Sequence, residues 1–125
     1  MQDLGIIELI EDGRIDLITS SVVEFELKKT PDPERISSGL KVISLHSERI
    51  TLSDKIVKRA KEFEMRNIKA IDALHLAIAD VEKIDYLCTC DDRFRKSASK
   101  IKKLDTKIVS PIEFIEEYEN DYDNK

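Results

Sequence analysis

The sequence is poor in residues that mark several common functional classes. It has no tryptophan, three glycines, two cysteines and two histidines among 125 residues. Three glycines are too few for a glycine-rich phosphate loop. Cys88 and Cys90 have no second Cys/His pair to complete a zinc site, so two reduced, partly buried thiols are expected. Ser20 and Ser21 lie outside any G-x-S-x-G motif and are interpreted as helix caps rather than nucleophiles.

Long apolar runs are also missing. The apolar runs are only a few residues long, whereas about 20 are needed to span a bilayer. The first residues, MQDLGIIELIEDG, place acids beside the apolar residues and have no basic lead, unlike a secretory signal. We therefore expect a cytoplasmic protein without membrane contact.

The charge is unevenly distributed along the chain, whose net charge is −5. Residues 93–107 carry seven Lys/Arg against one acid, and residues 113–123 carry six acids and no base. A basic segment beside an acidic one is compatible with a local phosphate-binding surface. For a charge run taken alone, a solvated helix is the favoured explanation.

Hydrophobic periodicity predicts helices and strands that alternate along the whole chain. Helices are expected over residues 1–11, 22–29, 33–44, 54–66, 71–81, 93–103 and 111–118. Strands are expected over residues 14–19, 48–52, 86–89 and 106–109. Short connections between such elements are typical of an α/β fold with a mostly parallel sheet. We expect one domain over residues 1–125, with residues 119–125 as a disordered tail.

Acidic residues lie near the ends of the predicted strands. Asp91 and Asp92 follow one strand directly, and Glu26 lies on the helix after another. Asp72 begins an apolar helix, where a carboxylate is costly to bury unless a cation meets it. Ligands of parallel sheets bind at the carboxyl ends of the strands, and a divalent metal is one suitable cation. The alternative is that Asp72 only caps its own helix.

Two neighbours of these acids have simpler interpretations. His75 lies on the same apolar helix and is expected to be a hydrogen-bonded core histidine rather than a ligand. Glu24 lies two positions before Glu26, on another helix face, and is expected to be solvated.

Three motifs taken together resemble those of PIN-domain proteins, especially VapC-like toxins. They are SSVVEFEL at 20–27, AIDALHLAIA at 70–79 and CTCDDRF at 88–94. Their order and spacing are fairly specific as a set, although each motif alone is weak. The resemblance implies a three-layer α/β/α fold and a metal-dependent ribonuclease, with acids holding Mg²⁺ or Mn²⁺ at one end of a parallel sheet.

The resemblance also implies roles for particular residues. Glu26, Asp72 and Asp91 match the acids that bind the metal and catalyse the reaction. Asp92 is a neighbouring acid that assists as a ligand, and Thr89 is the hydroxyl that accompanies Asp91. The implied chemistry is metal-assisted attack of water on a phosphodiester.

Basic residues and partners follow from the same resemblance. Arg93, Arg95 and Lys96 are candidates to hold RNA phosphates. Proteins of this type are expected to pair with a small antitoxin and often to form homodimers.

The chain departs from the family pattern at its start. Family members open with a strand that carries an Asp at the centre of the sheet, and nothing before Arg14 resembles such a strand. Asp3 lies in a helical pattern. We therefore expect a fold incomplete at its N-terminus, with unpaired strand edges that favour a homodimer or strand-swapped oligomer. The alternative function is a catalytically inactive PIN remnant that serves as a binding or dimerisation module.

Overall fold

The α/β class predicted from the sequence is confirmed by a computed structural model, which describes residues 3–123. The helices of this part are α1 Asp3–Glu11, α2 Ser21–Lys28, α3 Pro33–Ile43, α4 Asp54–Glu64, α5 Ala70–Val81, α6 Asp92–Ser99 and α7 Pro111–Asp123. The strands are β1 Ile18–Ser20, β2 Glu48–Ile50, β3 Tyr86–Cys88 and β4 Lys107–Val109. None of the helices in the described part is long and apolar enough to cross a membrane.

Local sequence signals fix several helix ends. Ser20 and Ser53 cap α2 and α4, and their side chains each accept a hydrogen bond of 3.2 Å from the backbone N–H of Val23 or Ile56. Gly13 follows α1 with φ of 73°, a left-handed conformation that glycine adopts without steric cost. The cap at Ser20 was predicted from the sequence.

Backbone turns explain two of the boundaries that differ from the prediction: β1 begins later than predicted and α6 ends earlier. β1 begins at Ile18, since the N–H of Arg14 still donates to the carbonyl of Leu9 at 2.9 Å and closes the end of α1. α6 ends at Ser99 rather than at 103, and the following loop takes Lys103 to φ of 68°, which no α-helix accommodates.

The closing helix, α7, runs past its predicted end at 118 and reaches Asp123. It therefore includes part of the predicted tail over 119–125, and residues 124–125 of that tail lie outside the described part.

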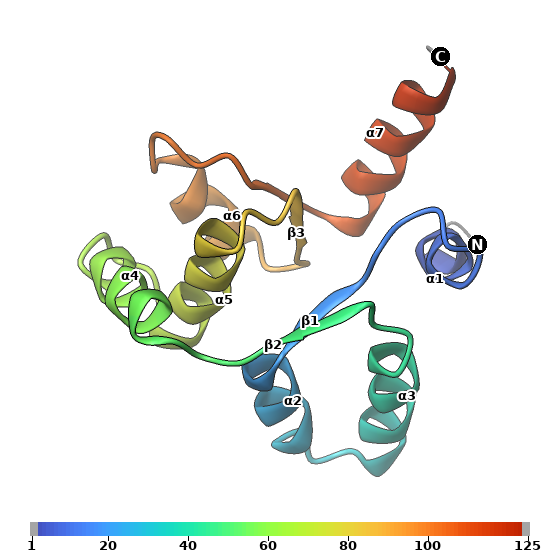
Figure 1. Cartoon of the computed structure of the whole chain (residues 1–125), viewed down its shortest axis with the longest axis horizontal. Helices are drawn as coiled ribbons and strands as arrows, with labels where there is room; N and C mark the ends of the chain where they lie inside the picture. The colour runs from blue at the N-terminus through green and yellow to red at the C-terminus, as the bar shows by residue number, and fades with distance from the viewer. Residues whose placement is uncertain (1–2, 124–125) are drawn as a thin grey trace.

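The strands form two separate parallel pairs rather than one sheet. β1 pairs with β2 in the register Ile18↔Glu48, and β3 pairs with β4 in the register Tyr86↔Lys107. Figure 1 shows the first pair beside α2 and α3, and β3 on the side of α5 and α6. Within residues 3–123, β1 and β3 therefore each have one edge without a strand partner.

The core is centred on α5. Ala73, Leu76 and Ala77 of this helix are fully buried, and α4 packs along it with Phe63 buried. Phe94 of α6 joins the same cluster. Burying one face of α5 in this way holds the first turn of the helix, and the acid it carries, in a fixed place.

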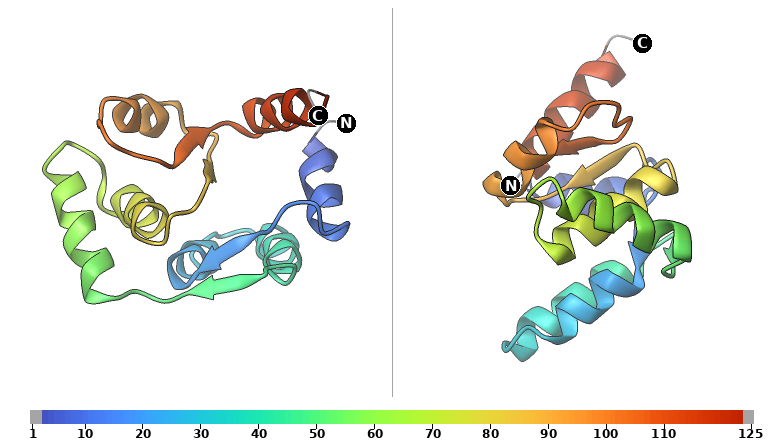
Figure 2. Two further views of the ribbon diagram at one scale, coloured as in Figure 1. Left: turned by 45° about the horizontal axis from the view of Figure 1, so that its top comes forward. Right: turned by 90° about the vertical axis from the view of Figure 1, so that its left-hand side faces the viewer.

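Two further contacts complete the fold. α1 packs against α7, so the first and last helices lie side by side (Figure 2). α2 packs against α3, and Arg49 of β2 binds the carboxylate of Glu24 through two hydrogen bonds of 2.7 and 2.8 Å. This bond is a correction to the prediction that Glu24 is solvated. It lowers the pKa of Glu24, chiefly through hydrogen bonding.

Candidate functional site

Three of the predicted site acids act on one another electrostatically. Burial raises the pKa of the Asp72 carboxyl, and the negative charges of Asp91 and Glu26 raise it further. The charges of His75 and Lys69 act in the opposite direction. Like charges have such an effect on a carboxyl, so the negative charges of Asp91 and Glu26 act on Asp72, although the three acids do not lie close enough within the described part to share an ion.

Asp72 is the acid of this group that lacks a partner. It is the third residue of α5, and the N-cap Lys69 makes no side-chain capping bond. Among the described residues the Asp72 carboxylate makes no hydrogen bond and no ion pair. A negative charge is favourable in the first turn of a helix, but the Asp72 side chain makes no capping hydrogen bond there. A half-buried carboxylate without a partner is suited to an added cation.

Asp91 is fixed by the turn that follows β3. Its side chain accepts a hydrogen bond of 3.1 Å from the N–H of Phe94 and so caps α6. Its own N–H donates to the Thr89 hydroxyl at 3.1 Å. Thr89 therefore holds the backbone of Asp91, and the supporting role in catalysis stays a prediction.

Glu26 has a partner that the sequence did not reveal. Its carboxylate hydrogen-bonds Nε2 of His75. His75 is half-buried one turn after Asp72 on α5, so the predicted hydrogen bond exists but its partner is a site acid. The spacing of three residues between Asp72 and His75, which puts both on one helix face, was the available signal.

Asp92 and Arg95 bind each other rather than joining the group. The Arg95 guanidinium contacts the Asp92 carboxylate and the carbonyl of Thr89. The Asp92 side chain is 77% exposed and directed to solvent. Arg93 and Lys96, the other predicted RNA-binding residues, are exposed, and no ion pair holds either of them in residues 3–123.

The donor set fits a divalent metal in kind, although its spacing is wide. Mg²⁺ and Mn²⁺ prefer carboxylate oxygens, and Asp72 has no competing partner. Within the described part of the chain, no group of three His, Cys, Asp or Glu residues lies close enough to hold one ion. The carboxylates of Glu26 and Asp91 already accept hydrogen bonds, from His75 and from Phe94 respectively.

The two cysteines do not extend this site. Cys88 and Cys90 are free thiols, and both are exposed rather than partly buried as expected. Cys88 is exposed because it ends β3, which lacks a strand neighbour on one edge.

Comparison with known proteins gives one match. A family model described as PIN domain matches residues 4–100. No curated protein and no solved structure matches the chain significantly. The matched range contains Glu26, Asp72 and Asp91.

Proposed function

The chain belongs to the PIN domain family, a family of nucleases, and from this premise we propose that it is a metal-dependent endoribonuclease of the VapC toxin type. The observation that supports the proposal is the half-buried carboxylate of Asp72, which has no partner among the described residues and whose pKa is raised by burial and by the charges of Asp91 and Glu26. An unpartnered carboxylate that two other carboxylates oppose is stabilised by a divalent cation. PIN nucleases typically use such ions.

Each residue has a role in this proposal. Asp72, Asp91 and Glu26 would hold Mg²⁺ or Mn²⁺, which when bound activates water and neutralises charge on the phosphate. Thr89 holds the backbone of Asp91, and His75 orients the carboxylate of Glu26.

The basic residues divide into two groups. Arg93 and Lys96 are exposed and available to RNA phosphates. Asp92 is engaged with Arg95, and we assign this pair to stiffening the turn that carries Thr89 and Asp91 rather than to metal or RNA.

A protein partner belongs to the same proposal. The unpaired edges of β1 and β3 favour pairing with another chain, either a second copy or a small antitoxin.

A second candidate function is an inactive PIN module that only binds. Two observations favour it: within residues 3–123 no three ligands lie close enough to share a metal ion, and the strands form two separate pairs.

Cleavage of a structured RNA distinguishes the two functions. We expect cutting with Mn²⁺, no cutting with EDTA, and loss of cutting in Asp91→Asn. Asparagine caps helices as well as aspartate does, so this variant keeps α6 intact while removing the charge. Asp105→Asn, which removes one exposed acid from another loop, is the matched control and should still cut. Folded wild-type protein that fails to cut RNA with Mn²⁺ would support the binding module.

A further inference from the structure

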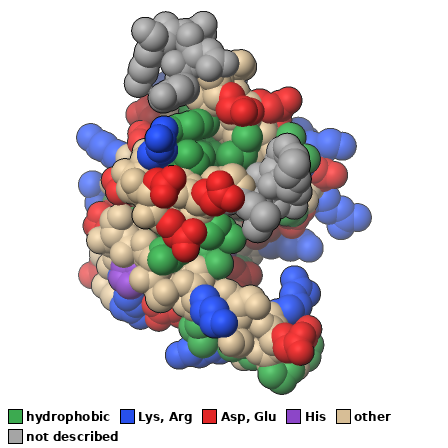
Figure 3. All heavy atoms as spheres, turned by 90° about the vertical axis from the view of Figure 1, so that its right-hand side faces the viewer, with side chains coloured by type: hydrophobic (Ala, Val, Ile, Leu, Met, Phe, Trp, Pro, Cys, Tyr) green, Lys and Arg blue, Asp and Glu red, His purple; other side chains and the backbone are tan. Residues whose placement is uncertain are grey.

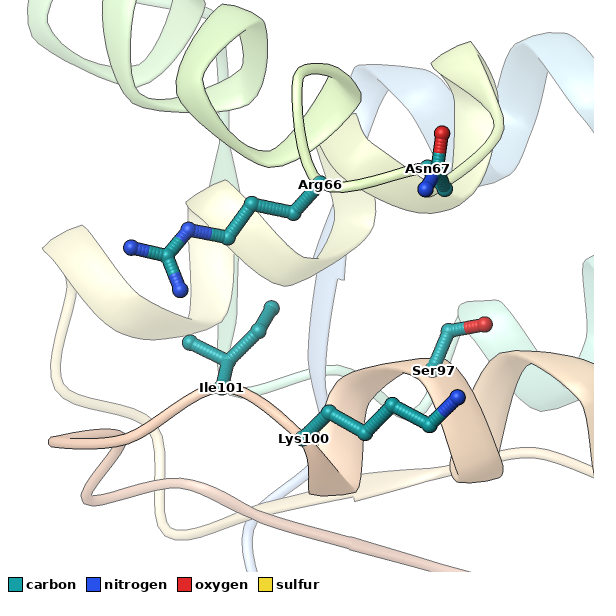
Figure 4. Close-up of a pocket in the computed structure, with 5 residues that line it drawn as sticks. All are labelled: Arg66, Asn67, Ser97, Lys100 and Ile101. Carbon is teal, nitrogen blue, oxygen red and sulfur yellow. The ribbon is translucent and has the colours of Figure 1, made fainter.

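A groove on another part of the surface collects cations. Two adjoining hollows of about 300 and 550 Å³ share Arg66 and Ile101. They lie between the end of α4 with its loop to α5 and the end of α6 with its loop to β4; Figure 4 shows the smaller one. We call this surface the basic groove and define it by its charged residues: Arg59, Glu62, Arg66, Lys100, Lys102 and Lys103.

Most of this positive charge is not neutralised. Arg59 donates to Asp80 at 2.7 Å and to Glu62 at 2.8 Å, so the one acid of the basic groove is already bound. The four remaining cations make no ion pair within residues 3–123: they are Arg66, Lys100, Lys102 and Lys103. Neighbouring cations repel one another, and a bound anion relieves that repulsion.

The charge of the basic groove is opposite to that of the molecule. The chain has a net charge of −5. Figure 3 shows Asp and Glu side chains gathered across the centre of the face on the side of α1 and α7. An acidic protein that concentrates cations in one hollow attracts a polyanion to that place and repels it elsewhere.

Both loops of the basic groove have demanding backbone conformations. Asn67 has φ of 67° and Lys103 has φ of 68°. Asparagine tolerates the left-handed region, but a lysine side chain is strained there. Such a conformation persists where the surrounding structure fixes it, so the loop that presents Lys102 and Lys103 has a defined shape.

The lining also suits a nucleotide better than a lone phosphate. Met65 is 85% exposed at the end of α4, next to Arg66. A planar guanidinium stacks on bases, and the thioether of an exposed methionine makes favourable contacts with aromatic rings. An isolated phosphate would bind to the cationic side chains of the basic groove alone and would make no use of the Met65 side chain.

The basic groove is joined to the candidate site through two elements. α6 runs from its cap Asp91 to Lys100, about 14 Å at 1.5 Å per residue, which is the length of a few nucleotides. The loop with Arg66 leads directly into α5, whose first turn carries Asp72.

We propose that the basic groove binds the backbone of single-stranded RNA on one side of the cut site, with Arg66 and Lys100 on its phosphates. This inference rests on the proposed function, since it assumes RNA as the substrate. It adds a contact surface to the one offered by Arg93 and Lys96.

The test is the binding of a fluorescently labelled uridine oligomer, measured by anisotropy in EDTA so that no cutting occurs. In Arg66→Glu/Lys100→Glu, each lost phosphate contact should lower the affinity roughly fivefold at about 0.1 M salt, hence about 25-fold together. The slope of log affinity against log salt should fall by about 1.4. Arg35→Glu/Lys41→Glu, on the exposed surface of α3, makes the same change of charge and should bind RNA nearly as wild type does.

Unchanged RNA affinity in the folded groove variant would overturn the inference, and so would an equal loss in the α3 variant. If the charge reversal prevents folding, Arg66→Gln/Lys100→Gln gives the same decision with a smaller expected loss. Failure of the proposed function is a separate result: wild type would then bind the oligomer through the groove but not cut RNA with Mn²⁺.

Discussion

At the residue scale, the charge of Asp72 determines how the stability of the candidate site depends on pH. Without a metal, this carboxylate is half-buried, unpartnered and opposed by Asp91 and Glu26, so its pKa is raised in the folded protein. The folded state therefore binds the Asp72 proton more tightly than the unfolded state does. Stability conferred by that proton is lost as pH rises from the ordinary value of 3.8 through the raised pKa.

The raised pKa of Asp72 predicts how the substitution Asp72→Asn changes thermal stability. In EDTA at neutral pH the variant should melt a few degrees higher than wild type, because the amide has no charge to bury. Below the ordinary pKa of 3.8 the difference should disappear, since Asp72 is then protonated in both states. Thermal melts followed by circular dichroism across this pH range measure the effect.

Asp92→Asn is the control for this experiment. It also removes one negative charge, but it breaks the bond to Arg95, so no gain in stability is expected. An Asp72→Asn protein that melts no higher at neutral pH, or that keeps its advantage in acid, would contradict the electrostatic account.

Motif and position predicted Glu26, Asp72 and Asp91 as one group at the carboxyl ends of parallel strands, and that grouping stays a prediction. The pairing of side chains was beyond the sequence. Whether Arg95 binds RNA or Asp92 depends on which acid its rotamers reach, and Glu26 finds its partner on a helix far along the chain.

At the element scale, two helix glycines meet different surroundings. A Cβ on Gly39 of α3 would come within 2.6 Å of Leu27 Cδ1 and 3.3 Å of its Cγ, so Leu27 would have to move. A Cβ on Gly5 of α1 would meet Ile115 of α7 at 3.4 Å, an ordinary contact. Close packing of α2 on α3 therefore requires glycine at position 39. The contact between α1 and α7 tolerates an alanine in place of Gly5.

Replacing each of the two glycines by alanine should change the free energy of unfolding in opposite directions. Gly39→Ala should lower the free energy of unfolding by about 1 kcal/mol, because overpacking of roughly 1–3 kcal/mol exceeds a gain in helix propensity of about 1 kcal/mol. Gly5→Ala should keep that gain of about 1 kcal/mol. Urea unfolding of both variants measures the difference, and equal stabilisation by the two would show that α2 and α3 are not closely packed.

Most elements were predictable because their caps are encoded locally. Ser20, Ser53 and Gly13 each fix a helix end through their own side chain or backbone. The end of α6 was not predictable, because the charged pattern continues helically to 103 while the backbone leaves the helix after Ser99.

At the scale of the whole molecule, the separation of the two strand pairs leaves edges that other chains can use. Within the described part each of the four strands has one edge without a strand partner, and Cys88 at the end of β3 is exposed, whereas Thr19 and Ser20 of β1 are buried. We therefore predict self-association that grows with protein concentration. Light scattering over a concentration series measures it, and a clean monomer at high concentration would contradict this prediction.

Lysine substitutions test whether the β3 edge is responsible. Lysine on an exposed strand edge discourages pairing. Cys88→Lys places the charge on β3, whereas Cys90→Lys places the same charge beyond the strand. Only the first should reduce association. Equal effects would assign the contact to another surface.

The α/β class was predictable from the alternation of elements, but the basic groove was not. Its residues come from loops whose approach depends on how α4, α5 and α6 pack, and no single segment contains them. The basic run over 93–107 gave a partial signal, since Lys100, Lys102 and Lys103 belong to it.

We propose that Asp72, Asp91 and Glu26 bind one metal ion together, and in the described residues they reach it only by moving closer than they lie in this structure. Calorimetric titration with Mn²⁺ tests this proposal most directly, using wild type, Asp72→Asn, Asp91→Asn and Glu26→Gln, with Asp105→Asn, an exposed acid in another loop, as the control. The account predicts one Mn²⁺ per wild-type chain, weaker binding in each of the three variants and unchanged binding in the control. Equal Mn²⁺ affinity in wild type and Asp72→Asn would contradict it.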